Sequence, residues 1–416
     1  MTMLSRIPNK FKHDMTCIEL LALITFNLLL FQPIIEIILP PFSYYDEILA
    51  VSSLLSLFFS MAMRKSRFTR EMKIALCLLF AIVVIGLFGN FLSGIVSDTF
   101  FILVDILACS KFFIIYFALK SILGNTSYFV SYMARESKVL LVLMLACLVI
   151  NQFVDIGMTY EMRYGLKAFQ FVFIHPTHMV TLSLACMAFI YSDASNGVGK
   201  KYIGIALVLM AMSLRSRWVA LALVIVLIII FVKKGVYARS LCRNWRRIGS
   251  AFLVGQAQMS VYYGSASESA RGHLMTTALS VFQNFFPLGA GFASFGSGVT
   301  KTIYSPLYYQ YGLQNVYGLA PNNPSYLTDT FWPVVLAQFG FLGLIIWLLL
   351  LIMLVVDFYR LGIASGMLVL SLTMIAAILI STTASGSIFS MQMITLLVAF
   401  MTAMKANIDR EACERA

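Results

Sequence analysis

Arginines placed beside apolar runs are the residues of this chain whose type and position could do chemistry. Arg215 and Arg217 stand two positions apart between two apolar runs. Arg271 lies early in a long polar stretch, and Arg163 lies in a shorter one. Guanidinium groups form paired hydrogen bonds to phosphate oxygens and stay charged when partly desolvated. Because few acidic residues accompany them, these arginines indicate an anionic ligand that carries phosphate groups.

Asp329 is the candidate general base. It is one of only two acidic residues between positions 265 and 330, and it stands where the long polar stretch meets an apolar run. A carboxylate there could take a proton from a substrate hydroxyl. The alternative is an N-terminal cap for the helix that follows, which aspartate also provides well.

Three of the four histidines are candidates for lining a substrate site. His175 and His178 have the three-residue spacing of one helix face, and His273 lies beside Arg271. A metal ion needs more ligands than the sequence offers near them, so we expect no metal site. The seven cysteines show no metal or redox spacing, and we interpret them as small packing residues.

Several signatures of soluble enzymes are missing from the sequence. It has no GxxxxGK[ST] phosphate loop, no HExxH, no GxSxG and no closely spaced aspartate pair for a divalent cation. A nucleotide-driven pump is therefore not expected, and no cofactor is expected either.

The composition places these residues in a membrane. Hydrophobic residues make up 60% of the chain, charged residues 12%, and the mean hydropathy is +0.89. An ordinary soluble domain does not have this composition. Apolar runs of about 17 to 25 residues recur along the chain, and each could cross the hydrocarbon as a helix. The fold class predicted is an all-α, polytopic integral membrane protein with a single membrane domain over residues 1–416.

The hydropathy pattern predicts about twelve spans, with both termini on one side. The expected spans are residues 16–38, 43–62, 74–96, 99–119, 138–155, 168–191, 201–214, 216–232, 248–264, 330–354, 363–380 and 386–404. No cleavable signal peptide is expected, because the first apolar run is long enough to span.

Basic residues indicate which side is cytoplasmic. The densest basic segments are residues 64–73 and the loop 233–247, and both fall on the same side of the predicted topology. The positive-inside rule makes that side the cytoplasm. These residues account for the net charge of +12 by flanking spans. They do not form one basic patch with interleaved aromatics, so nucleic acid is not an expected partner.

The same topology places the 265–328 loop outside the cytoplasm, together with Arg163, Arg215 and Arg217. The first part of this loop has the spacing of a short amphipathic helix, with a capping-box pattern at Ser265 and Glu268. Tyr308, Tyr309 and Tyr311 belong to a tyrosine-rich span that could bind sugars or form an interfacial aromatic belt. The outer-leaflet position makes polyprenyl diphosphate the expected class of anionic ligand.

Three stretches carry a resemblance to a known family. They are SLRSRWVALAL at 213–223, Arg271 with FFPLGAGFASFGSG at 285–298, and DTFWPVVLAQFGFLGL at 329–344. YYDE at 44–47 and RYGLKAFQFVFIHPTHM at 163–179 agree with them. The chain resembles the O-antigen polymerase and ligase superfamily, integral membrane glycosyltransferases with a GT-C-like fold that use undecaprenyl-diphosphate-linked glycans.

The resemblance implies a polymerase of O-antigen or another polysaccharide. Ligases of this superfamily typically carry a His-Asn pair eleven residues before the first glycine of Gly-x-x-Gly. Counting back from Gly340 reaches Asp329-Thr330 instead, which favours a polymerase over a ligase. The implied partners are a lipid-linked oligosaccharide donor and acceptor, membrane lipids and a chain-length regulator. The implied location is the bacterial inner membrane, with cytoplasmic termini and a periplasmic site.

With the reaction that the resemblance implies, the positions of individual residues suggest roles for them. Arg215, Arg217 and Arg271 would converge on the diphosphate of the donor, with Arg163 as a fourth member, and Asp329 would be the base for the acceptor hydroxyl. Fixed arginines would stabilise the leaving diphosphate without a metal. The remaining candidate substrate-binding residues are His175, His178, His273, Tyr308, Tyr309 and Tyr311.

Three alternatives stay open. A ligase would transfer the glycan to lipid A-core. A lipid-linked oligosaccharide flippase would also need many spans and arginines, but it should show repetition between its halves and charges along a central path. Charges inside the predicted spans are few, and Asp105 and Lys111 are the clearest of them. A membrane scaffold without catalytic activity is the third alternative.

Overall fold

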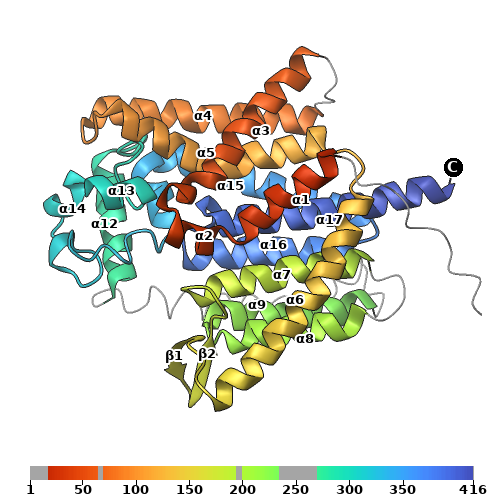
Figure 1. Ribbon diagram of the computed structural model, residues 1–416. Coiled ribbons are helices and arrows are strands. Elements are labelled where there is room, and N and C mark those ends of the chain that lie inside the picture. The colour runs from red at the N-terminus through yellow and green to blue at the C-terminus, as the bar shows by residue number, and fades with distance from the viewer. Residues whose placement is uncertain (1–16, 64–68, 194–198, 234–268, 416) are drawn as a thin grey trace, which may run out of the picture.

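The chain folds as a bundle of helices with an elaborated loop region at one end (Figure 1). The computed structural model describes residues 17–63, 69–193, 199–233 and 269–415. The predicted span 248–264, the basic loop 233–247 beyond its first residue, and the proposed cap residues Ser265 and Glu268 lie outside the described residues.

The first half of the described chain is helical except for one β-hairpin. Its elements are α1 (Cys17–Leu30), α2 (Gln32–Ile38), the 3-10 helix η1 (Pro40–Tyr44), α3 (Tyr45–Ala62), α4 (Arg70–Ser93), α5 (Thr99–Ile122), α6 (Ser127–Phe153), β1 (Thr159–Arg163), β2 (Leu166–Phe169), α7 (Pro176–Asp193), α8 (Gly199–Met212) and α9 (Ser216–Lys233).

The second half begins with short helices of the long loop and ends with three long helices. Its elements are α12 (Ala270–Asn284), α13 (Gly298–Ile303), α14 (Pro306–Gln310), η2 (Leu313–Asn315), α15 (Trp332–Ala364), α16 (Leu368–Ala384), η3 (Ser387–Phe389) and α17 (Met391–Arg415). The amphipathic helix expected in the loop is therefore present as α12. Its N-cap is Ser269, whose hydroxyl accepts a hydrogen bond from the Gly272 N–H.

Long apolar helices support a membrane location. Within the described ranges, five helical segments are long and apolar enough to cross a bilayer: Pro40–Ala62, Arg70–Ser93, Thr99–Ile122, Trp332–Ala364 and Met391–Cys413. The bent pair α1 and α2 would make a sixth. Ser216–Val232 and Leu368–Thr383 are shorter apolar helices. The protein is thus a mostly helical membrane protein.

The first predicted span is broken instead of continuous. Its two halves, Glu19–Leu30 and Gln32–Ile38, meet at an angle of 73°. Pro33 lies in the first turn of α2, where a proline is tolerated because its missing N–H would have no helical partner there. Farther along, Pro40 and Pro41 start η1.

A β-hairpin replaces the beginning of the predicted span 168–191. Its strands pair antiparallel around the two-residue turn Tyr164-Gly165, and both turn residues have positive φ (53° and 74°). A two-residue turn with positive φ at both positions matches the twist of a hairpin. The following helix, α7, then starts only at Pro176.

The ends of the helices lie in two groups, one at each end of the bundle. We call the end with α12 to α14 and the β1–β2 hairpin the loop end; the C-terminus lies at the opposite end (Figure 1). Contacts at the loop end include Asn90 with Phe292, His175 with Arg215, Arg217 with Ser385, and Gly386 with Thr328. Contacts at the opposite end include Lys120 with Asp357, Thr126 with Thr402, Ser192 with Ala403, and Asn407 with Ser365.

A turn that contains Gly289 and Gly291, which we call the glycine turn, holds the long loop against the bundle. The N–H groups of Ala290 and Gly291 donate to the carbonyls of Ala337 and Gln338 at 2.8 and 2.9 Å. This contact requires a break in α15 at Gly340, which has φ 60° and ψ −153°. A Cβ on Gly340 would lie 2.3 Å from the Pro287 carbonyl oxygen, so only glycine fits there.

Two buried polar side chains hold the same loop from inside the bundle. The Asn90 side chain exchanges two hydrogen bonds with the backbone of Phe292, at 2.8 and 2.9 Å. Asp105, which is fully buried, accepts from the Ala293 N–H and from the Gln338 side chain. The loop is therefore anchored to α4, α5 and α15, and this fixes where its residues lie relative to the helix ends.

Candidate functional site

Arginines from two segments meet at the loop end, in a group we call the arginine cluster: Arg163, Arg215 and Arg217 with Glu161 and His175. The hairpin strand β1 supplies Arg163 and Glu161. The tight connection between α8 and α9 supplies Arg215, and the first turn of α9 supplies Arg217. Glu161 Oε1 lies 2.8 Å from Arg163 Nε and 3.3 Å from Arg215 Nη2. Two guanidinium groups therefore share one carboxylate oxygen.

The ring of Tyr160 further orders Arg215. The guanidinium carbon lies 4.7 Å from the centre of the Tyr160 ring, a cation–π arrangement. The same tyrosine ring meets the His175 ring edge to face at 5.0 Å. The hairpin that the sequence did not predict is thus the element that positions Arg215.

His175 contributes a neutral imidazole to the cluster. Its Nδ1 accepts a hydrogen bond from the Thr177 N–H at 3.1 Å, and its Nε2 lies 3.4 Å from Arg215 Nη2. Burial, reinforced by the positive charges of Arg215 and Arg217, lowers the pKa of His175 to about 4.

Arg217 joins three helices. Its Nη1 donates to the Ser385 hydroxyl at 2.6 Å, after the end of α16, and its Nη2 donates to the Thr177 hydroxyl at 3.1 Å, in the first turn of α7. Its guanidinium carbon also lies 4.7 Å from the Trp218 ring centre. This planar fork therefore fixes the relative positions of α7, α9 and α16 at the loop end.

Arg271 and Asp329 form an ion pair. Arg271 Nη2 donates to Asp329 Oδ2 at 2.8 Å, and each side chain is about 30% exposed (30% and 31%). The sequence suggested that the arginines have too few carboxylates to pair with, and for Arg271 that reasoning was wrong because the loop folds back onto the start of α15. Helix capping by Asp329 is not observed either: α15 starts at Trp332, and its N-cap residue, Phe331, makes no side-chain cap bond.

A short run of contacts connects this ion pair to the arginine cluster. Arg217 binds Ser385, and the next residue, Gly386, donates its N–H to the Thr328 carbonyl at 3.4 Å. Thr328 directly precedes Asp329. Residues from four distant parts of the chain are therefore linked by contacts at the loop end.

Helix N-termini add to the positive potential of this region. α7 begins at Pro176, directly after His175, and α9 begins at Ser216, between Arg215 and Arg217. Unpaired N–H groups and the helix dipole make such ends favourable for anions. The arrangement suits a ligand with more than one negative charge.

The other predicted residues are distributed unevenly. His178 lies in the first turn of α7, and its Nδ1 is 3.4 Å from the Gln392 side chain. His273 lies on α12, two residues after Arg271, and is partly exposed. Tyr309 is 55% exposed, whereas Tyr311 is partly exposed and its hydroxyl accepts from Asn284 at 2.7 Å.

Tyr308 does not fit the predicted sugar-binding role. It is fully buried in the core of the loop, where its hydroxyl accepts from the Gly296 N–H and donates to Thr300. A sugar cannot reach it there. The alternation of inward and outward tyrosines is a consequence of the short helix α14, which the sequence analysis did not resolve.

Sequence reasoning missed several polar partners in the region. Thr177, Ser385 and Gln392 contact the predicted arginines and histidines, but single hydroxyls and amides give no pattern that separates them from other membrane residues. The signal available for Thr177 was its place inside the HPTH segment. Within the described part of the chain, no group of three or more His, Cys, Asp or Glu residues is arranged to hold a metal ion.

No family model matches this sequence, and a search of the curated proteins found no match.

Proposed function

We propose that this protein is a membrane glycosyltransferase that polymerises lipid-linked polysaccharide repeat units. The observation that supports the proposal is that Arg217 is connected to the Arg271–Asp329 pair through Ser385, Gly386 and Thr328 at one end of the bundle, where Arg215 also lies. Fixed cations beside a carboxylate suit a reaction in which a diphosphate leaves and a hydroxyl loses a proton. The resemblance of the three sequence stretches points to the same chemistry.

The proposed reaction is a displacement at a sugar carbon. A hydroxyl of the acceptor repeat unit attacks the anomeric carbon of the donor glycan, and its proton passes to Asp329. The bond from that carbon to the diphosphate oxygen breaks, and undecaprenyl diphosphate leaves with the electron pair. Arg215 and Arg217 stabilise the negative charge that develops on the leaving oxygen.

Arg271 has a second role in this proposal. Because it donates to Asp329 Oδ2, it orients the carboxylate. A guanidinium group has five N–H donors, and in this proposal Arg271 also contacts a phosphate oxygen. The base and the diphosphate site are then coupled through one side chain.

We also propose a bacterial inner-membrane location with about twelve spans, cytoplasmic termini and a periplasmic loop end. The grouping of helix ends into two sets supports an alternating path, and the basic segments support its orientation. Alkaline phosphatase fused after residue 300 should be active, and a fusion after residue 240 should be inactive. The reverse pattern would overturn the orientation.

The glycan of a deletion strain tests the reaction class. We expect each lipid A-core molecule to carry one repeat unit, because ligation continues without polymerisation. Absence of any attached repeat unit would indicate a ligase. Accumulation of unflipped lipid-linked units would indicate a flippase, and an unchanged glycan would indicate a scaffold.

A further inference from the structure

A pocket lies between α4, α5 and α15 at the end of the bundle opposite the arginine cluster. Its volume is about 200 Å³. It takes no part in the proposed reaction, since its lining residues lie near the start of α4 and near the ends of α5 and α15. These three helices are among those long and apolar enough to cross a bilayer.

The interior of the pocket is apolar. Met72 and Ala75 from α4, Phe113 and Phe117 from α5, and Leu350 from α15 line it, and all five are buried. At the rim, Ile352 and Val356 also line the pocket, and both are exposed. In a bilayer, exposed apolar side chains on a spanning helix face acyl chains, so the pocket is open to the lipid phase.

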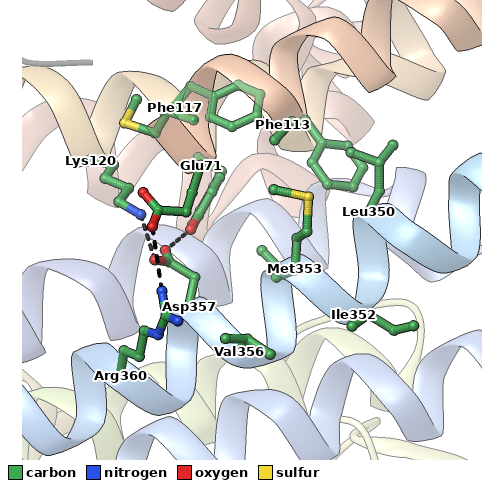
Figure 2. A pocket seen from close by; sticks show the side chains of 14 residues that line it. Glu71, Phe113, Phe117, Lys120, Leu350, Ile352, Met353, Val356, Asp357 and Arg360 are labelled. Atoms are coloured by element: carbon green, nitrogen blue, oxygen red, sulfur yellow. Dashed lines mark hydrogen bonds and ion pairs between the residues drawn. The ribbon is translucent and has the colours of Figure 1, made fainter. Parts of the chain in front are cut away.

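Charged groups of both signs gather at one side of the pocket. Figure 2 shows Glu71, Lys120, Asp357 and Arg360 pointing toward one another there, with Phe113 and Leu350 at the other side. Lys120 pairs with Asp357 at 2.5 Å, and Tyr116 also donates to Asp357.

The second ion pair of the pocket is looser. Arg360 Nη1 lies 3.6 Å from Glu71 Oε1, and the two side chains are 64% and 56% exposed. Exposed pairs at this separation contribute little to stability, so a ligand can part them at small cost. Once the Arg360–Glu71 pair is separated, a cation and a carboxylate lie side by side at the pocket.

The position of these charges matches the headgroup region of a bilayer. Glu71 is the second residue of α4, and Lys120 lies in the last turn of α5. A helix that spans the hydrocarbon has its ends at the level of lipid headgroups. The pocket thus has an apolar interior on the hydrocarbon side and paired opposite charges at the level of the headgroups.

We propose that this pocket binds one membrane phospholipid with a zwitterionic, primary-amine headgroup. One acyl chain occupies the apolar chamber, the phosphate contacts Arg360, and the ammonium donates to Glu71. The four charges that line the mouth cancel, so these charges give no net attraction for a lipid with net negative charge. A quaternary ammonium has no N–H to donate, so a choline headgroup is held less tightly than an amine.

Native mass spectrometry of the purified full-length protein tests this proposal. The probes are phosphatidylethanolamine, phosphatidylcholine and phosphatidylglycerol with identical acyl chains, each titrated into the same detergent. We expect tightest retention of phosphatidylethanolamine. Glu71→Gln should weaken its binding about tenfold, to the level of phosphatidylcholine, because a charge-assisted hydrogen bond is lost. Arg360→Gln should weaken all three lipids.

The matched control is Lys73→Gln, which changes an exposed charge on the same turn of α4 that does not line the pocket. It should leave the lipid order unchanged. Equal binding of phosphatidylethanolamine to wild type and Glu71→Gln would overturn the proposal. So would tighter retention of phosphatidylglycerol, or of an added polyprenyl phosphate, than of the amine lipid. Both substituted side chains are exposed, so folding should not be affected.

Discussion

Replacing Asp329 with asparagine separates catalysis from structure at the loop end. Asparagine has the same shape and can still accept a hydrogen bond from Arg271, but it cannot take a proton at neutral pH. The ion pair makes one contact at 2.8 Å between side chains that are about 30% exposed (30% and 31%). Pairs of that kind contribute roughly 0.2–1 kcal/mol. Asp329→Asn should therefore cost at most about 1 kcal/mol of stability.

The expected effect on the reaction is much larger. Removing a general base lowers a rate by about 10²–10⁴, which corresponds to roughly 3–5 kcal/mol of activation free energy. The assay is polymerisation by purified protein in liposomes, followed as the growth of a glycan ladder from lipid-linked repeat units. Thermal melting in detergent gives the stability of each variant in parallel.

Asp98→Asn is the matched control. Asp98 is the N-cap of α5, where its carboxylate accepts from the Phe100 N–H at 2.9 Å, and asparagine caps a helix equally well. This variant should keep its full rate. The reasoning about Asp329 fails if Asp329→Asn produces polymer at the wild-type rate and with the same length distribution, since the carboxylate would then only hold Arg271 in place.

Four further outcomes follow from the geometry. Arg217→Lys should lower kcat/KM about tenfold or more, because lysine cannot donate to two hydroxyls in a fork; an unchanged value would remove Arg217 from the site. Arg271→Lys should retain part of the activity and Arg271→Ala almost none at normal protein levels, and normal activity of the alanine variant would contradict both of its roles. Gly340→Ala should lower the free energy of unfolding by about 1–3 kcal/mol or more, because an alanine is strained at the positive φ of this position, and the melting temperature should fall accordingly. The control is Gly204→Ala, whose added methyl group meets open space within a helix and should be neutral or stabilising. Because the pKa of His175 is lowered to about 4, its neutral form stabilises the folded protein above its ordinary pKa of about 6.5, and this stability is lost as the pH falls toward 4. The melting temperature should therefore fall more steeply between these pH values for the wild type than for His175→Gln. Parallel curves would contradict the buried, neutral ring.

Much of the helical framework could be predicted from the sequence because apolar runs report it directly. The starts of α5 and α9 lie where charged or polar residues interrupt those runs, and the prediction placed them to the residue. α6 was different, since it begins at Ser127, well before the predicted 138. Its first turns carry charges that the structure satisfies from other helices, as in the pair of Lys138 with Asp193.

Features that depend on distant contacts could not be predicted. The break at Gly340 exists because the glycine turn near Gly291 docks against it, and nothing in either stretch alone specifies that contact. The pairing of Arg271 with Asp329 joins residues 58 positions apart and required the fold of the loop between them. By contrast, the sequence could predict that Arg215 and Arg217 lie close together, because only a short connection separates two neighbouring apolar helices there.

The central claim is that one polypeptide links lipid-linked repeat units at its loop end. The most direct test supplies the purified protein, in liposomes, with a single defined undecaprenyl-diphosphate-linked repeat unit and no other protein. Our account predicts a ladder of lipid-linked oligomers, with one undecaprenyl diphosphate released for each unit added. Failure to form any oligomer under conditions in which the protein is folded, or translocation of the substrate without oligomers, would contradict it.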